Sequence, residues 1–348
     1  MRRRIAERMV PQIDPDAWAV DDVSFPKDGR MSVAVAPQYC GALGKQANCQ
    51  VALSVHAVSD AASCPLTWRL FLPKEWADDA VRRRRTGVPD DVGHREKWRL
   101  ALDALDELAG WGLVPPVVVA DAGYGQNADF RAGLTERGHA YVVGIRGDIT
   151  VQPHEAVPVA PAWSGTGRRP VPRYRQPPVT VAELAAAAGR EAFSEVTWRE
   201  GSRGPMTSRF LAVWVRPAGV RSRRLAQQAA VAGHGRWDGV LPQVRLLAEW
   251  PDGEDEPTRF WLSDLPDNTP IPQLVRLAKI RWRIEHDYRE LKHGLGLDHF
   301  EGRSWTGWHH HVTLVTAAHA FLTEQRLAPK ADTADSPSTR SSTPSRTC

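Results

Sequence analysis

The sequence has little cysteine and no long apolar run. Its 348 residues include four cysteines, Cys40, Cys49, Cys64 and Cys348, without a CxxC pair and without the density of a secreted disulfide scaffold. No apolar stretch approaches the roughly 18 residues of a membrane span. The N-terminus, MRRRIAERMVPQ, lacks the apolar segment of a secretory signal. We therefore expect reduced thiols, no membrane partner and a cytoplasmic protein.

Lysine is also scarce, with seven residues against 38 arginines. The formal net charge of +4 is too small to establish a polyanionic partner. Arginine favours phosphate through its bidentate fork, but a compositional bias explains the excess equally well. A lysine at a motif position is therefore more informative in this chain than an arginine.

The composition is that of a globular protein, with 42% apolar and 25% charged residues, which excludes a fibrous or wholly disordered chain. The length allows two domains, or one domain with a large insertion. The C-terminal residues 327–348 are rich in Ser and Thr and poor in large aliphatic residues. Such a segment cannot bury enough surface to fold, so we expect a disordered tail.

The first half of the chain has the pattern of a mixed sheet flanked by helices. Three strand-like segments, at 17–25, 31–40 and 49–59, are separated by turn-forming residues and predict an antiparallel meander. A helix at 95–110, a buried strand in PPVVVADAG, a helix at 126–138 and a strand at 139–147 follow. This order of elements is that of an α/β, ribonuclease H-like fold.

The second half begins with a change of pattern. Residues 148–265 contain many prolines, a short Ala-rich helix and separate strand-like segments, which predict a β-rich insertion. Strong helical periodicity returns at 269–296, and a last helix is expected at 305–327. We divide the chain into an N-terminal remnant (1–16), a core in two parts (17–147 and 266–326), the insertion (148–265) and the tail (327–348).

Three acidic positions are candidates for chemistry. Asp121 ends the apolar run VVVAD and precedes Ala-Gly-Tyr-Gly, and ligands commonly bind beyond the carboxyl ends of parallel strands. Asp21 and Asp22 interrupt an apolar strand, where an unpaired carboxylate is costly without a cation or an arginine beside it. Glu285 lies on the most periodic helix, within about 60° of Arg281, Tyr288 and Lys292.

Taken together, these acids predict a metal site. Two strand aspartates and one helix glutamate are the hard oxygen ligands that Mg²⁺ prefers, and paired metals stabilise both the attacking and the leaving oxygen of a phosphoryl displacement. Glu290 is excluded because five helical residues place it about 140° from Glu285.

The same residues resemble a known family, the insertion-sequence transposases of the DDE superfamily. WAVDDVSFPKDG resembles the segment of the first aspartate and VVVADAGYG that of the second. Arg281, Glu285 and Lys292 match three positions of a Tyr-Arg-Glu-Lys signature, whose tyrosine position is Ala278. The resemblance covers about 17–147 and 257–325, with a β-rich insertion in the expected interval.

The resemblance implies a catalytic and metal-binding triad of Asp22, Asp121 and Glu285. In the family pattern the first aspartate directly precedes a threonine-like position. Val23 occupies that position here, which maps the first aspartate to Asp22, and Asp21 stays open as the alternative. Two Mg²⁺ or Mn²⁺ ions are implied as cofactors. Arg281, Lys292 and, more weakly, Arg146 would contact DNA phosphates. Trp198, Trp214, Trp250 and Trp261 of the insertion are interpreted as core residues. In related transposases one insertion aromatic stacks on a displaced base, and the sequence does not identify which tryptophan would do so here.

The function implied is that of a DNA transposase, which cuts and transfers strands of a mobile element in the bacterial nucleoid. Its partners would be double-stranded DNA, as transposon ends and target, and a second copy in a homodimer. Relatives carry an end-binding region before the first catalytic strand, so we expect an N-terminally truncated chain. Two alternatives remain: a remnant that binds DNA without cutting, and a ribonuclease H-like nuclease without strand transfer.

Overall fold

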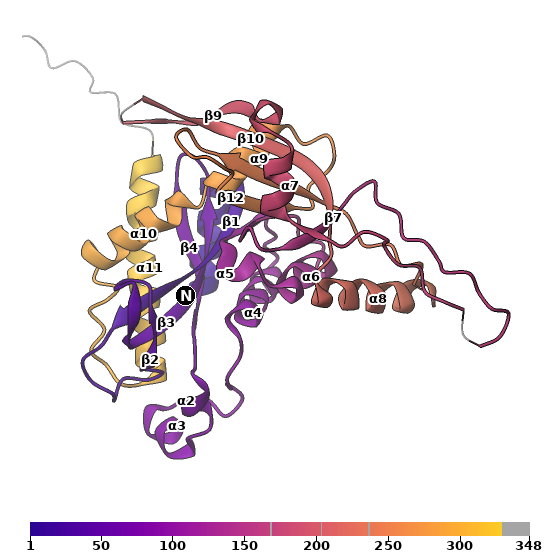
Figure 1. The fold of residues 1–348 in the computed structure, drawn as a ribbon. Coiled ribbons are helices and arrows are strands. Elements are labelled where there is room, and N and C mark those ends of the chain that lie inside the picture. Colours follow the sequence, from indigo (N-terminus) through magenta and orange to yellow (C-terminus); the bar gives the residue numbers. More distant parts are fainter. Residues whose placement is uncertain (168, 203, 236, 329–348) are drawn as a thin grey trace, which may run out of the picture.

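A computed structural model describes residues 1–167, 169–202, 204–235 and 237–328 of the protein (Figure 1). The predicted tail lies outside these residues from 329 onward. None of the described helices is long and apolar enough to cross a lipid bilayer.

Five strands form the centre of the sheet. Their order is β4–β3–β1–β5–β6, in which β1 is antiparallel to β3 and parallel to β5, and β5 is parallel to β6. This arrangement confirms the predicted ribonuclease H-like mixed sheet. The strands are β1 (Ala17–Pro26), β3 (Lys45–Val58), β4 (Ser63–Leu70), β5 (Val118–Ala120) and β6 (Tyr141–Ile145).

The meander differs from the predicted one in two strands. The segment 31–40 forms only a short edge strand, β2 (Ala36–Cys40), and the third main strand is β4, which the sequence analysis did not predict. Pro65 obscures the strand pattern of β4. It lies opposite His56, where the pairing of β3 and β4 shifts register, and such an irregularity accommodates a residue without a backbone N–H.

The insertion strands continue the central sheet. β12 pairs with β6, and β11, β10 and β7 follow outward, with β8 beside β7 and β9 beside β10. The prediction of a β-rich segment is confirmed, and the pairing of β12 with β6 shows how it joins the core. Its strands are β7 (Thr150–Pro153), β8 (Val179–Thr180), β9 (Ser194–Gly201), β10 (Gly204–Pro217), β11 (Val244–Trp250) and β12 (Arg259–Ser263).

Helices cover both faces of the sheet. Side chains of Trp18 and Val20 pack with one group of helices, α1, α4, α6 and α11. Side chains of Ala17 and Ala19 pack on the other face with α9 and the start of α10. The helices are α1 (Arg2–Ile13), α2 (Lys74–Ala77), α3 (Ala80–Thr86), α4 (Lys97–Gly110), α5 (Ala122–Gly125), α6 (Ala128–Glu136), α7 (Val181–Ala187), η1 (Arg190–Ala192), α8 (Val220–His234), α9 (Ile271–Lys279), α10 (Trp282–His293) and α11 (Trp305–Leu327).

The signature region is two helices rather than one. The predicted helix at 269–296 is interrupted at Ile280 and Arg281, which keep helical dihedral angles but separate α9 from α10. No glycine or proline lies at the break. The Arg281 side chain pairs there with Asp21 of β1, so the interruption falls where the helix meets the sheet.

Close packing behind Asp121 gives a first prediction. Gly125 of α5 lies so near β6 that an added Cβ would be 2.1 Å from the Gly144 carbonyl oxygen and 2.9 Å from the Val143 Cβ. We expect Gly125→Ala to lower the free energy of unfolding by at least about 2 kcal/mol, because the backbone of β6 cannot yield. Urea unfolding measures the change. Gly93→Ala, where the new Cβ meets nothing within 4 Å, is the control, and equal stability of the two variants would contradict the packing described.

Candidate active site

The candidate site lies at the open edge of β1. Ala120, the last residue of β5, pairs with Val20, and β1 continues to Pro26 without a described strand on that side. Asp21 directly follows Val20 and Asp121 directly follows Ala120, so the two aspartates lie side by side on neighbouring segments. Side chains alternate along a strand, and Ala19 and Val119 both face α9. Asp21 and Asp121 consequently point toward the face that α9 and α10 cover.

Asp21 is a nearly buried carboxylate held by an arginine. Its Oδ2 atom accepts a hydrogen bond of 2.8 Å from Arg281, and its Oδ1 atom accepts one of 2.8 Å from the backbone N–H of Asp22. Burial raises the pKa of Asp21 to about 6, the charge of Arg281 opposes this rise, and the charges of Asp121 and Asp22 add to it. The carboxylate thus belongs to a group of like charges that share one cation.

Arg281 is the centre of this group. It stands at the start of α10, and its Nε atom is buried without a hydrogen-bond partner. Burial lowers the pKa of Arg281, but the charges of Asp21, Asp121 and Glu285 outweigh it, so that the net shift is upward. Asp21 contacts the Arg281 guanidinium group directly, whereas Glu285, one turn further along α10, is exposed.

Asp22 points the other way. It pairs in register with Leu53, whose side chain belongs to the core beneath α4, and its carboxylate forms an ion pair with Lys97 at the start of α4. Asp22 also lines a pocket of about 220 Å³ together with Ser24, Lys97 and Lys292. Sequence reasoning missed Lys97, although the scarcity of lysine was a signal for it.

The predicted phosphate-binding residues lie around the same edge. Lys292 donates a hydrogen bond of 3.0 Å to the Ser24 carbonyl oxygen, and burial lowers its pKa, against the charge of Asp298. Arg146 follows β6 with a side chain that is 68% exposed and lies 3.7 Å from Asp148. Its backbone N–H bonds to Gln126, next to the short helix that Asp121 begins.

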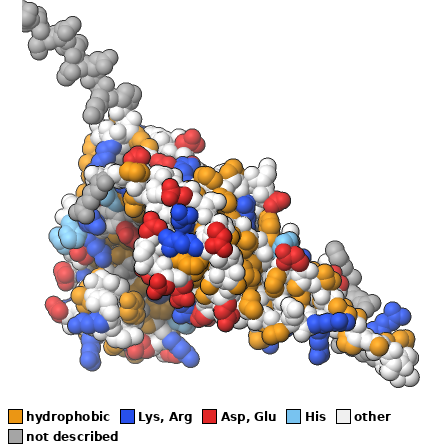
Figure 2. Space-filling model, turned by 45° about the horizontal axis from the view of Figure 1, so that its top comes forward, with side chains coloured by type: hydrophobic (Ala, Val, Ile, Leu, Met, Phe, Trp, Pro, Cys, Tyr) orange, Lys and Arg blue, Asp and Glu red, His pale blue; other side chains and the backbone are white. Residues whose placement is uncertain are grey.

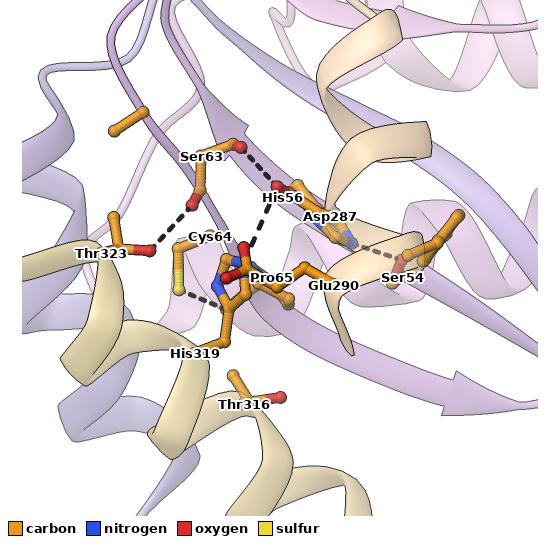
Figure 3. A network of polar contacts seen from close by, with 12 residues as sticks. Ser54, His56, Ser63, Cys64, Pro65, Asp287, Glu290, Thr316, His319 and Thr323 are labelled. Atoms are coloured by element: carbon orange, nitrogen blue, oxygen red, sulfur yellow. Dashed lines mark hydrogen bonds and ion pairs between the residues drawn. The ribbon is translucent and has the colours of Figure 1, made fainter. Parts of the chain in front are cut away.

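A buried polar network anchors α10 to the sheet (Figure 3). Asp287 accepts hydrogen bonds from Ser63 at 2.6 Å and from the Nδ1 atom of His56 at 2.8 Å. The chain continues from His56 Nε2 to Ser54 at 2.9 Å and from Ser54 to the Tyr288 hydroxyl at 2.7 Å. Since Ser54 pairs with Asp21 across the strands, this network ends beside the candidate site.

Sequence reasoning missed this network as well. Asp287 lies three residues after Ile284 and four before Leu291, both of which are buried. An acid within the apolar stripe of a helix is a sign of a buried, partnered charge. Its partners came from β3, β4 and α11, and their pairing with α10 is not visible in the sequence.

The described residues contain no group of three His, Cys, Asp or Glu side chains arranged to hold a metal ion as they stand. Asp21 is bonded to Arg281 instead, and Asp121 lies beside Asp21 where β1 pairs with β5. Their oxygens are nonetheless the hard donors that Mg²⁺ and Mn²⁺ take, and the burial of Asp21 beside two further acids leaves negative charge for a cation to balance. The residues present therefore fit a divalent cation.

A comparison with protein-family models matches residues 1–205 to the DDE superfamily endonucleases. The chain belongs to this family. The resemblance noted in the sequence is thereby confirmed, and the match includes Asp21, Asp22 and Asp121 but ends before Glu285. A probable transposase for insertion sequence element IS701 from Microchaete diplosiphon is 29% identical over 139 residues. That match covers 40% of this chain and 34% of the relative, so the chain matches about a third of the relative's length.

The buried network around Asp287 gives a second prediction. Burial alone would raise the pKa of Asp287, but the hydrogen bond and charge of His56, the charge of His319 and the Ser63 hydroxyl hold it below the ordinary 3.8. The ionised carboxylate therefore stabilises the fold above that pH, and the contribution is lost as the pH falls through the lower, folded-state value. We expect Asp287→Asn to cost about 3 to 5 kcal/mol at neutral pH.

Urea unfolding across a pH series checks this expectation. The difference between Asp287→Asn and the unaltered chain should shrink below about pH 4. Asp91→Asn, an exposed position, should show no such difference at any pH. An Asp287→Asn chain as stable as the unaltered one at neutral pH would contradict the role given to the network.

Proposed function

We propose that this DDE endonuclease is a transposase, which cleaves DNA phosphodiesters with divalent metal ions and transfers the strands of a mobile element. The proposal is carried by the placement of Asp121 beside Asp21 through the pairing of β1 with β5, and by the bond between Asp21 and Arg281, which lies one helical turn before Glu285. The likeness to an IS701 transposase supports the same reaction class. Double-stranded DNA would be the substrate, and joining two ends requires two copies, which favours a homodimer.

In this proposal the carboxylates of Asp21, Asp121 and Glu285 hold two Mg²⁺ or Mn²⁺ ions. The ions would activate a water or a DNA 3′-hydroxyl for attack and stabilise the leaving oxygen. Arg281 has to release Asp21 for the carboxylate to bind a cation. Its guanidinium, still beside the site, is then free to bind a phosphate oxygen of the substrate through its paired N–H donors.

The first acid is assigned on geometry. The motif favours Asp22, whereas the register favours Asp21, because Asp21 shares a sheet face with Asp121 and with the helix of Glu285. Asp22 is engaged by Lys97 of α4, and the pocket that it lines lies at the edge of β1, where it also reaches Tyr288 and Lys292 of α10. We therefore propose Asp21 as the first metal ligand and Asp22 as the partner of Lys97.

Two cations beyond Arg281 have proposed roles in holding DNA. Lys292 lines the pocket beside β1 and donates a hydrogen bond to the Ser24 carbonyl oxygen. A backbone contact, and not an acid, thus holds its ammonium group in place. Arg146 is exposed at the carboxyl edge of the sheet and carries only a long ion pair to Asp148. Both suit the phosphate contacts that position DNA without reading its sequence.

A third prediction compares two glutamates of α10. Glu285→Gln should abolish Mg²⁺-dependent cleavage of supercoiled plasmid, because it removes a metal-binding charge from an exposed side chain and leaves stability unchanged. Glu290 instead pairs with Arg326 and lies 3.5 Å from His319 of α11, away from the other acids. Glu290→Gln should cut within a few-fold of the unaltered rate.

The plasmid assay also separates the alternatives. Loss of cleavage in Glu290→Gln with retention in Glu285→Gln would overturn the assigned site. Undiminished cutting in excess EDTA would overturn the metal mechanism. An unaltered chain that binds DNA and never cuts would instead be a binding remnant, and one that cuts without joining ends would be a nuclease.

A fourth prediction decides between the adjacent aspartates. Asp21→Asn should eliminate cleavage, whereas Asp22→Asn should retain it within about tenfold, since it removes an ion pair of a half-buried surface carboxylate. Both variants are assayed on one plasmid preparation, with circular dichroism melting as the control for folding. The reverse result would return the first metal ligand to Asp22, as the motif predicts.

A further inference from the structure

Two arginines from separate parts of the chain meet on one tryptophan. The guanidinium carbon of Arg199, on β9 of the insertion, lies 3.5 Å from the centre of the Trp282 ring. The guanidinium carbon of Arg283, next to Trp282 on α10, lies 4.6 Å from the same ring. Contacts of this kind hold the face of a guanidinium and leave the N–H donors at its edge free.

These two charges are not neutralised within the described part of the chain. No ion pair or side-chain hydrogen bond there involves Arg199 or Arg283, and the Arg283 Nε atom is buried without a partner. Arg199 and Arg283 thus place two positive charges against one tryptophan ring. Holding like charges together has a cost that a bound anion would remove.

A neighbouring cation shows the contrast. Lys279 of α9 also lies against aromatic rings, 4.6 Å from Trp198 and 5.4 Å from Trp261. Its ammonium group, however, is 2.5 Å from the carboxylate of Glu249 and is nearly buried. The fold therefore pairs the cation that it buries and leaves the two arginines on Trp282 with their donors unused.

The position of the cluster connects it to the candidate active site. Trp282 directly follows Arg281 and precedes Glu285 by three residues, which places it about 60° from Glu285 around α10. Arg283 lies about 160° from Glu285, so the cluster flanks the candidate active site and does not face into it. Figure 2 shows basic side chains on the face in view interspersed with acidic and hydrophobic ones, rather than gathered in one broad patch. Local placement of charge is therefore more informative here than net charge.

We propose that Arg199, Trp282 and Arg283 form a phosphate clamp, in which the insertion and α10 together hold the DNA backbone where it flanks the candidate active site. The clamp rests on the function proposed above. Its ligand is a phosphodiester of duplex DNA, because two guanidinium forks beside a phosphoryl-transfer site match paired phosphate oxygens. Trp282 sets the distance between the forks, and Arg199 makes the insertion part of the DNA-binding surface.

Fluorescence anisotropy with a labelled duplex of arbitrary sequence tests the clamp. Arg199→Gln and Arg283→Gln should each weaken binding about tenfold and lower the slope of log affinity against log salt concentration by about one. Arg224→Gln removes the same charge from an exposed position on α8 and should change neither. Trp282→Leu keeps the net charge and should weaken binding as much as either arginine variant, since both guanidinium groups lose their support.

The outcomes separate the clamp from the proposed function. If Arg199→Gln, Arg283→Gln and Trp282→Leu all bind DNA with the affinity and salt slope of the unaltered chain, the clamp is wrong and the proposed function stands. If the two arginine variants weaken binding and Trp282→Leu does not, the arginines bind DNA without support from the tryptophan, and the clamp is again wrong. If the unaltered chain binds no DNA, both proposals fail. Melting temperatures within the range of the Arg224→Gln control establish that the variants are folded.

Discussion

The charge of Arg281 is the constraint around which the candidate site is organised. The charges of Asp121 and Asp22 act against ionisation of Asp21, and a buried carboxylate is costly without a cation beside it. Arg281 supplies that cation from the point where α9 and α10 separate. The two helices are in turn fixed by packing of Leu277, Ile280 and Ile284 against the sheet, so hydrophobic burial determines where the charge is delivered.

The buried polar network around Asp287 fixes the middle of α10. Asp287 and His56 are both almost fully buried, and a pair of this kind contributes little net stability compared with apolar residues. It does orient α10, because Asp287 points toward Ser63 and His56 (Figure 3) while the Tyr288 hydroxyl bonds to Ser54. The helix that carries Glu285 is thereby held in register with β1 and β3, which carry Asp21 and its neighbour Ser54.

Local patterns predicted much of this architecture. The strand at 17–25, the helix at 95–110 and the strand before Asp121 were visible as periodicity and turn chemistry, and they were sufficient for a ribonuclease H-like fold. β4 was not predicted because Pro65 disguises it, and the pairing of β12 with β6 depends on contacts between distant segments. The orientation of Asp21 and Asp22 likewise follows from register with β5, which no local pattern contains. The same is true of Lys97 and of Arg199, whose partners lie on other elements.

Anomalous scattering from crystals soaked in Mn²⁺ tests whether Asp21, Asp121 and Glu285 hold a metal ion. We expect anomalous peaks between these three carboxylates, with the Arg281 side chain displaced from Asp21. A peak beside Asp22 and Lys97, or an undisturbed Arg281–Asp21 pair with no peak near Glu285, would contradict this expectation.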